Sequence, residues 1–485
     1  MKKQTTAILL LFAILLAGCG GTEPADTTVA ATDAQTTAAG PRDGLPEDLD
    51  FGGTEVKIHA GLWMGVTSDP LSEYYVEEAT GDVVDDAVFN RNRTVEDRLN
   101  VKLTYTWHET EWASRQEELN FYKSSIMAGD DAFDIVFYIA HLLPSVAVGG
   151  AMHNLADMEY INLSQPWWAQ LYNSAATVGD SLYFATGDIV IGSYLNAYCM
   201  YFNHKLIDEL KLDDPYTLVE SGKWTLDTLR KMSAASYGDL NGDTVPDESD
   251  RFGLVVQGGN IISGFMEASD VKIIDLAKDG KSGQYVFGSE RNVNVVEKVR
   301  ELLFDSEGVL YVKDDSAASE YLFNDGNVVF TGGWFGDTDY YRELNFDFGI
   351  VPYPKFDEAQ ANYYTRMGTA VPVAAVPVTT KNPDMVSAVL EVMAAEGYYQ
   401  LRPAYFDTAL KNKYSRDEKT KEMVDKIIAN IAVDFGTIYV YSLNDISDKF
   451  KTTIYKNESN WASNTASWET QVMTSLDNLL TAING

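Results

Sequence analysis

Six residues of one acidic segment have the types and spacing that bind a hard divalent cation. Oxygen-bearing side chains occupy positions one, three, five, nine and twelve of the segment from Asp239 to Asp250. Ca²⁺ takes oxygen ligands from such a loop, including one backbone carbonyl from position seven. The ligands expected for a structural Ca²⁺ are Asp239, Asn241, Asp243, Val245 through its carbonyl, Asp247 and Asp250.

This segment resembles EF-hand and dockerin calcium loops, with two departures. Glycine stands at position four, while position six, where glycine is usual, holds Thr244; Asp250 closes the loop in place of glutamate. The alternative is an acidic turn that needs no metal. We expect the ion because side chains clustered in this way repel one another without a cation.

The histidines and cysteines offer no comparable pattern. The five histidines contain no HExxH or other close metal-binding spacing, so no zinc site is expected. Cys199 lies in the apolar stretch 197–202, which is typical of a buried packing thiol and not of a nucleophile.

The first residues are typical of an export signal. Two lysines precede an apolar run, 6–17, that is too short to span a membrane and ends in Leu-Ala-Gly-Cys19. This ending resembles the bacterial lipobox, which implies removal of residues 1–18 and a lipid (palmitate) on Cys19. The mature chain is then anchored to the outer face of the cytoplasmic membrane and does not cross it. Residues 19–49 are poor in large apolar side chains and predict a disordered tether.

Composition limits what the remaining body can be. Its length, about 440 residues, predicts two lobes. A formal net charge of -35 excludes nucleic acid and anionic lipid as partners. Aromatic residues make up 12% of the chain, and a surplus of tryptophan and tyrosine suits carbohydrate recognition.

Alternating patterns predict an α/β first lobe. Strands are expected at 54–60, 101–107 and 133–138, with helices at 85–99 and 117–128 between them. Strand–helix–strand order predicts parallel strands. Further on, a helix is expected from Leu226 with Thr225 as its N-cap. Other expected elements are a strand at 197–202, a strand at 328–330, and helices at 293–303 and 384–395.

Several stretches in this order resemble the sugar-binding extracellular proteins of ABC importers, of the maltose-binding-protein type. They are 134–136, 181–185, 201–206, 222–225, 323–334 and 348–354. The resemblance covers the whole mature chain. It implies two α/β lobes joined by crossing hinge strands, the type II periplasmic-binding-protein fold. The expected lobe boundaries are 50–195 and 349–402 for the first lobe, and 196–348 and 403–485 for the second.

The resemblance and the position of strand ends select the same candidate ligand-binding residues. In doubly wound sheets ligands sit beyond the carboxyl ends of strands. The candidates are Trp63, Tyr138, His141, Tyr194, Asn196, Trp334 and Arg366. Trp334 matches the family's stacking tryptophan, although Gly333 replaces the proline that usually precedes it.

The resemblance implies a monomeric protein that captures a sugar between its lobes and delivers it to an ABC transporter permease, without catalysis. Two alternatives remain open at this stage. A binding protein for a peptide or another non-sugar solute would use Arg366 against a carboxylate. A secreted glycoside hydrolase would need two opposed carboxylates, and acidic residues are plentiful.

Overall fold

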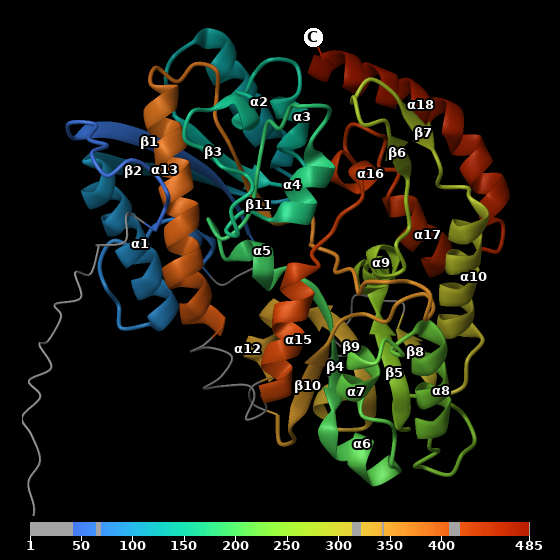
Figure 1. Ribbon diagram of the computed structural model, residues 1–485. Helices are drawn as coiled ribbons and strands as arrows, with labels where there is room; N and C mark the ends of the chain where they lie inside the picture. Colours follow the sequence, from blue (N-terminus) through green and yellow to red (C-terminus); the bar gives the residue numbers. More distant parts are fainter. Residues whose placement is uncertain (1–41, 65–68, 313–321, 342–343, 407–417, 485) are drawn as a thin grey trace, which may run out of the picture. The chain divides into compact units, whose positions relative to one another are not determined.

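The structure is a computed structural model that describes residues 42–64, 69–312, 322–341, 344–406 and 418–484 (Figure 1). Contacts divide the chain into two units, and the whole described part belongs to the second of them, 41–485. Cys19 and most of the predicted tether therefore lie outside the described residues. None of the described helices is long and apolar enough to cross a membrane.

The first lobe is built on a four-stranded sheet. Its strand order is β11-β3-β1-β2, with β1 parallel to both β2 and β3, and β11 antiparallel to β3. The strands are β1 (Thr54–Trp63), β2 (Val101–Thr110), β3 (Ile135–Ile139) and β11 (Pro372–Ala375). β3 is buried along its whole length, as expected for a strand covered on both faces.

Capping residues and runs of apolar residues account for the helices that cover this sheet. Asp82 caps the first helix by accepting hydrogen bonds from two backbone amides, and Asn100 ends it in the left-handed conformation. α13 (Pro383–Glu396) is rich in apolar residues and is buried on every side from Met385 to Glu396. The helices and short turns are η1 (Pro70–Glu73), α1 (Val83–Leu99), α2 (Arg115–Ala128), α3 (Pro144–Ala147), η2 (Leu155–Asp157), α4 (Gln170–Ala176), α5 (Gly192–Leu195), α13 (Pro383–Glu396) and η4 (Gly397–Leu401).

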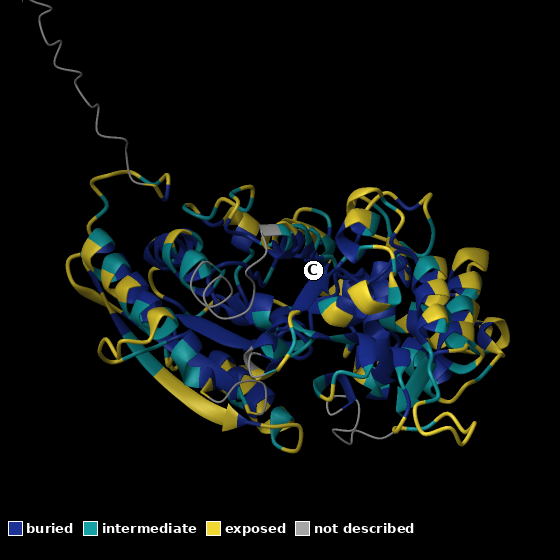
Figure 2. Cartoon of the chain, turned by 90° about the horizontal axis from the view of Figure 1, so that it is seen from below, coloured by how far each residue is buried: buried dark blue, intermediate teal, exposed yellow. Residues whose placement is uncertain are grey.

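The second lobe is built on a five-stranded mixed sheet of order β10-β4-β9-β5-β8. β5 is parallel to β8 and β9, whereas β4 is antiparallel to β9 and β10. The strands are β4 (Tyr198–Asn203), β5 (Phe252–Gln257), β8 (Val309–Val312), β9 (Val328–Trp334) and β10 (Phe348–Val351). β4 and β10 are buried along their whole length and β5 up to its last residue, whereas the edge strand β8 is half-buried; Figure 2 shows buried residues in the interior and exposed ones on the outer sides of helices.

Thr225 caps a helix of this lobe as expected, accepting a hydrogen bond from the backbone amide of Thr228. The helices and turns are α6 (His204–Leu210), α7 (Pro215–Glu220), α8 (Leu226–Ser236), α9 (Gly258–Ala268), α10 (Glu290–Phe304), η3 (Phe335–Asp337), α12 (Thr338–Tyr341) and α15 (Glu418–Ala429). After α15 come α16 (Phe435–Ile438), α17 (Asp448–Tyr455) and α18 (Trp461–Asn484). The hairpin of β6 (Ile274–Leu276) and β7 (Gly283–Tyr285) lies between α9 and α10 in the chain.

Two chain segments cross between the lobes, and main-chain hydrogen bonds join them to each other and to a third segment, 430–432. Residues 196–198 pair with 366–368: the amide of Tyr198 donates to the Arg366 carbonyl (3.0 Å), and that of Gly368 to the Asn196 carbonyl (2.9 Å). The third segment lies beside Thr365, whose carbonyl accepts from the amide of Ala432 (2.9 Å). These segments form a hydrogen-bonded joint between the two sheets.

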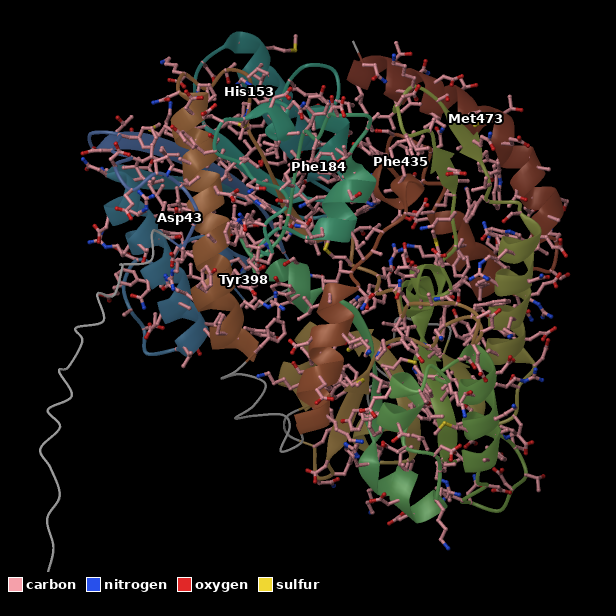
Figure 3. All side chains as sticks on the ribbon, in the orientation of Figure 1. Asp43, His153, Phe184, Tyr398, Phe435 and Met473 are labelled. Atoms are coloured by element: carbon pink, nitrogen blue, oxygen red, sulfur yellow. The ribbon has the colours of Figure 1, made fainter. Side chains whose placement is uncertain are left out.

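The structure corrects two expected boundaries. The second lobe was expected to end at residue 348, but β10 pairs with β4 as far as Val351, and the crossing back follows only at 365–368. The tether was expected to reach residue 49. Asp43 is instead buried against α1, where its carboxylate pairs with Arg98 (3.1 Å), so the chain is fixed to the first lobe from about that point (Figure 3). Small polar residues can be ordered when a buried ion pair holds them.

Candidate functional site

A cavity of about 1050 Å³ lies where the two sheets face each other across the joint. It is lined from the first lobe by the end of β1, the loop after β2 and the end of β3, and from the second by the start of β4, α9 and the end of β9. The polar and aromatic lining residues are Trp63, Asp69, Ser72, Glu73, Asp82, Asp85, Trp112, His141, Asn196, Tyr198, Asn260, Ser263, Trp334, Asp337, Arg366, Thr369, Tyr405, Asp448 and Lys451.

The first-lobe wall carries two tryptophans in contact with each other. Trp63 ends β1, and its ring meets that of Trp112 edge to face with centroids 6.4 Å apart. Trp112 is 57% exposed, and the Arg115 guanidinium lies 3.9 Å from its ring centroid. His141 follows β3, with its ring 5.7 Å from that of Trp112. This wall therefore offers aromatic surface that is open to a ligand.

The second-lobe wall also carries an aromatic pair, but it is held more firmly. The rings of Tyr198 and Trp334 meet edge to face at 5.6 Å. The backbone amide of Trp334 donates to the Asp337 carboxylate (2.8 Å), and Tyr198 is buried at the start of β4. Because β4 and β9 are antiparallel neighbours, the first residue of one and the last of the other lie at the same sheet edge.

Arg366 is fixed in this wall by an ion pair. Its Nη1 donates to both carboxylate oxygens of Glu267 on α9, at 2.7 and 2.8 Å, and both side chains are buried. Burial alone would lower the pKa of Arg366, but the adjacent Glu267 carboxylate raises it. The guanidinium is permanently charged and already neutralised, so it is poorly placed to bind a second carboxylate.

Two buried nitrogens of the lining have no hydrogen-bond partner among the residues that the structure describes. They are Nε2 of His141 and Nε of Arg366. A buried polar atom without a partner costs about 1–3 kcal/mol, so such atoms are uncommon in folded proteins. Burial lowers the pKa of His141, which favours the neutral ring. A ligand with hydroxyl or carbonyl groups would supply the missing partners.

Glu73 forms part of the cavity floor beside the joint. One of its carboxylate oxygens accepts a hydrogen bond from the backbone amide of Gly192 (2.9 Å). Burial raises its pKa from 4.5 to about 7, although the Gly192 bond and the nearby Arg91 oppose this. The cavity thus contains a carboxyl group that changes charge near neutral pH.

Five of the seven sequence-selected residues line the cavity, namely Trp63, His141, Asn196, Trp334 and Arg366. Tyr138 and Tyr194 do not, which corrects the expectation for both. Tyr138 is fully buried, and its hydroxyl donates to the Arg115 carbonyl (3.3 Å). The Tyr194 hydroxyl is directed to the buried carboxylate of Asp188. On β3 it is the next residue, Ile139, that lines the cavity, since alternate side chains point to opposite faces.

Sequence reasoning missed Trp112 and Tyr198. The strand before Trp112 was expected to end at residue 107, whereas β2 continues to Thr110 and places Trp112 just beyond its carboxyl end. The strand-end rule that selected Trp63 would have selected Trp112 with the correct boundary. Tyr198 stands at the amino end of an antiparallel strand, where that rule does not look.

The acidic loop adopts a sequence of tight turns in which its side chains accept from its own backbone. The Asp239 carboxylate accepts from the amides of Gly242 (2.6 Å) and Thr244 (3.0 Å), and that of Asp243 from Val245 (2.8 Å). Thr244 has a φ of 62°, the left-handed conformation that usually calls for glycine. Asp250 is buried, and its oxygens accept from Leu240 (3.0 Å) and the Tyr237 hydroxyl (3.0 Å).

The oxygen atoms of this loop meet some of the requirements of a calcium-binding loop but not all of them. The loop has the left-handed residue at position six, and its side-chain oxygens alternate along a tight curve. In the described part of the chain, however, it does not bring three carboxylate, imidazole or thiolate ligand atoms within 4.8 Å of one another. The Asp250 oxygens would also have to exchange existing hydrogen bonds for a metal ion.

Comparison with known proteins places the fold. No protein-family model and no curated protein sequence matches the chain. UspC from M. tuberculosis shares 14% identity with a TM-score of 0.58, covering 87% of this chain and 100% of UspC. The cyclic α-maltosyl-1,6-maltose binding protein of Arthrobacter globiformis shares 15% identity with a TM-score of 0.57, covering 90% of this chain and 100% of its own.

A third solved structure is the maltose-binding periplasmic protein MalE of Listeria monocytogenes in complex with maltose. It shares 13% identity with a TM-score of 0.55, covering 88% of this chain and 98% of its own. At such identities the likeness concerns the fold. The chain has the two-lobed α/β fold of maltose-binding-protein-type solute-binding proteins.

Proposed function

We propose that this protein is an extracellular solute-binding protein that captures an oligosaccharide between its lobes and delivers it to an ABC transporter permease. The observation that carries the proposal is the cavity, which has an aromatic pair on each wall and two buried nitrogens without partners. Sugars present C–H faces that pack on aromatic rings and hydroxyl groups that satisfy buried polar atoms.

Cavity size favours an oligosaccharide over a single sugar. Pockets that bury a drug-sized ligand have volumes of about 300–1,000 Å³. The volume of this cavity, about 1050 Å³, lies just above this range. The two aromatic pairs stand on different lobes, so a ligand that touches both favours the closed arrangement of the lobes. Ligand capture and the signal to the permease then arise from one movement.

The Glu267 contact weakens the case for a carboxylate-bearing ligand such as a peptide. That alternative rested on Arg366, whose Nη1 is already bound to Glu267 on both oxygens. Three solved structures of similar fold are a cyclo/maltodextrin-binding protein with maltotetraose, the cyclic α-maltosyl-1,6-maltose binding protein and MalE with maltose. By analogy we assign a binding role and not a catalytic one, with lipid attachment at Cys19 holding the body near the permease.

The test is calorimetry of the purified protein with maltose, maltotetraose and other oligosaccharides, followed by analysis of the sugar after incubation. Saturable binding with the sugar unchanged supports the proposal. Shortened sugar products would instead support a glycoside hydrolase that uses two of the cavity carboxylates. Binding of peptides but of no sugar would support the remaining alternative.

We also propose that the loop 239–250 binds a structural Ca²⁺ that stabilises the second lobe. The left-handed Thr244 and the run of oxygen ligands support this. A ligand present at 100 times its Kd stabilises a fold by about 2.7 kcal/mol. The melting temperature should therefore rise with CaCl2 relative to chelator, and Asp243→Ala should abolish the difference. An equal melting temperature in both conditions would show that the loop is a metal-free turn.

A further inference from the structure

Outside the cavity, two histidines and a glutamate from three separate elements converge on the first lobe. His59 lies on β1, His108 on β2 and Glu118 on α2, and their ligand atoms all lie within 4.8 Å of one another. The Glu118 carboxylate is 3.0 Å from His59 Nε2 through one oxygen and 2.8 Å from His108 Nδ1 through the other. Among the described residues this is the group whose atoms converge in this way.

The strand register explains why the two imidazoles meet. β1 and β2 are parallel, with His59 opposite Thr106 and Gly61 opposite His108. Residues two apart on a strand share a face, so His59 and His108 project towards the same helix. Gly61 leaves space for the Tyr138 ring and for the glutamate beside it, because a Cβ at that position would lie 2.5 Å from Tyr138 Cδ2 and 3.1 Å from Glu118 Cγ.

The surroundings orient the ligand atoms. Nδ1 of His59 is 2.8 Å from Thr106 Oγ1, so with a metal ion on Nε2 the Nδ1–H would donate to this hydroxyl. Such a partner on the second ring nitrogen is typical of metal-binding histidines. His59 and Glu118 are almost completely buried, whereas the His108 side chain is 49% exposed. One side of the cluster is therefore open to solvent.

Glu118 supplies the acidic group of the cluster, and its side chain is 2% exposed. In the described part of the chain, the ion pairs made by Glu118 are those with the two histidines.

We propose that His59 Nε2, His108 Nδ1 and Glu118 bind a divalent transition-metal ion, of which Zn²⁺ is the representative. Two imidazole nitrogens favour a transition metal over Ca²⁺ or Mg²⁺, which take oxygen ligands. Zn²⁺ bonds of about 2.0–2.2 Å in a tetrahedron place ligand atoms roughly 3.4 Å apart, so the present separations open by about half an ångström. Water enters as the fourth ligand from the exposed side.

The metal would link the edge strand β2 to α2. Trp112 lies in the loop between these two elements, and Arg115 is the first residue of α2. The site thereby fixes the base of the first-lobe aromatic wall. No spacing rule along the sequence reveals it, since the three ligands are separated by 49 and 10 residues. Only the strand register brings them together.

The test measures Zn²⁺ binding by calorimetry after removal of any purification tag, with CaCl2 present to saturate acidic loops. We expect one Zn²⁺ per chain, a higher melting temperature with Zn²⁺, and at least a tenfold loss of affinity in His108→Ala and Glu118→Gln. His153→Ala and His141→Ala remove histidines elsewhere and should bind as the original chain does. Co²⁺ in place of Zn²⁺ should give the visible absorption of a tetrahedral site.

His108 is half exposed, so its replacement is expected to leave the circular dichroism spectrum unchanged, and its result stands even if Glu118→Gln unfolds. The proposal is wrong if the protein shows no saturable Zn²⁺ binding, or if His108→Ala binds Zn²⁺ as tightly as the unaltered chain. It is equally wrong if His141→Ala abolishes binding, since the ion would then occupy the cavity.

Discussion

The two walls of the cavity use the same residue types but hold them differently. On the second lobe, Trp334 and Tyr198 pack together beside the buried Arg366–Glu267 pair. On the first lobe, Trp112 is mostly exposed and is held by contacts with Trp63 and Arg115. We infer that the second-lobe wall is a preformed surface, and that the first-lobe wall adjusts to the ligand and is completed by it.

Breaking the ion pair of the second wall should have the largest effect. Arg366→Met leaves the Glu267 carboxylate buried without a partner, which costs about 3–5 kcal/mol of folding free energy. The double variant Arg366→Met, Glu267→Met should recover most of this loss. Urea denaturation of both variants is the measurement. If Arg366→Met is as stable as the original chain, the Arg366–Glu267 ion pair does not hold this wall in place.

The buried carboxyl of the first lobe should produce a pH-dependent effect of similar size. The folded pKa of Glu73, about 7, is above its ordinary value of 4.5, so the folded state binds the proton more tightly. Below pH 4.5 Glu73 is protonated in both the folded and the unfolded state, so its burial has no ionisation cost. As the pH rises from 4.5 to 7 the unfolded state loses the proton first, and the free energy of unfolding falls by about 3 kcal/mol in all.

Glu73→Gln removes this cost and keeps an oxygen for the Gly192 amide. The variant should match the original chain near pH 4.5 and exceed it in unfolding free energy at pH 8. Denaturant titrations at several pH values give the difference curve. Asp188, Glu391 and Asp434, which also titrate near 7, remain in both proteins and cancel. A difference that does not change with pH contradicts the prediction.

Replacing one tryptophan on each wall separates binding from stability. Trp334→Ala and Trp112→Ala should each weaken binding of the oligosaccharide identified by calorimetry by about 1–2 kcal/mol, five- to thirtyfold in Kd. Trp112→Ala should leave the unfolding free energy within about 0.5 kcal/mol, because its ring is exposed. Trp334→Ala should lower it, because the ring packs on Tyr198. Equal stability losses would remove the distinction between the walls.

The smallest effect is expected at His141. His141→Phe keeps a ring beside Trp112 but removes the unpartnered Nε2, so one hydrogen bond to the ligand is lost. The cost is about 0.5–1.5 kcal/mol in affinity, with little change in melting temperature. His153, labelled in Figure 3 on the first lobe, lies outside the cavity lining and provides the matched control His153→Phe. Unchanged affinity in His141→Phe would show that the ligand does not reach this side.

Patterns that repeat along the chain could be predicted, and contacts between distant segments could not. The helix after Thr225 and the strands of the first sheet follow from capping and alternation, and strand ends led to Trp63 and Trp334. Tyr138 was misplaced because a strand residue one position off points to the opposite face. Glu267, the partner of Arg366, lies 99 residues away in the chain, so the residues near Arg366 gave no indication of this ion pair.

The joint between the lobes has a consequence for how such a chain can diverge. Its three segments are held by amide and carbonyl groups of residues 196–198, 365–368 and 430–432. Every residue except proline carries both groups, whatever its side chain. Side chains along these segments can therefore change without loss of the hydrogen bonds that hold the joint. Sequences that differ widely can keep the same joint, which agrees with a shared fold at 13–15% identity to the solved structures above.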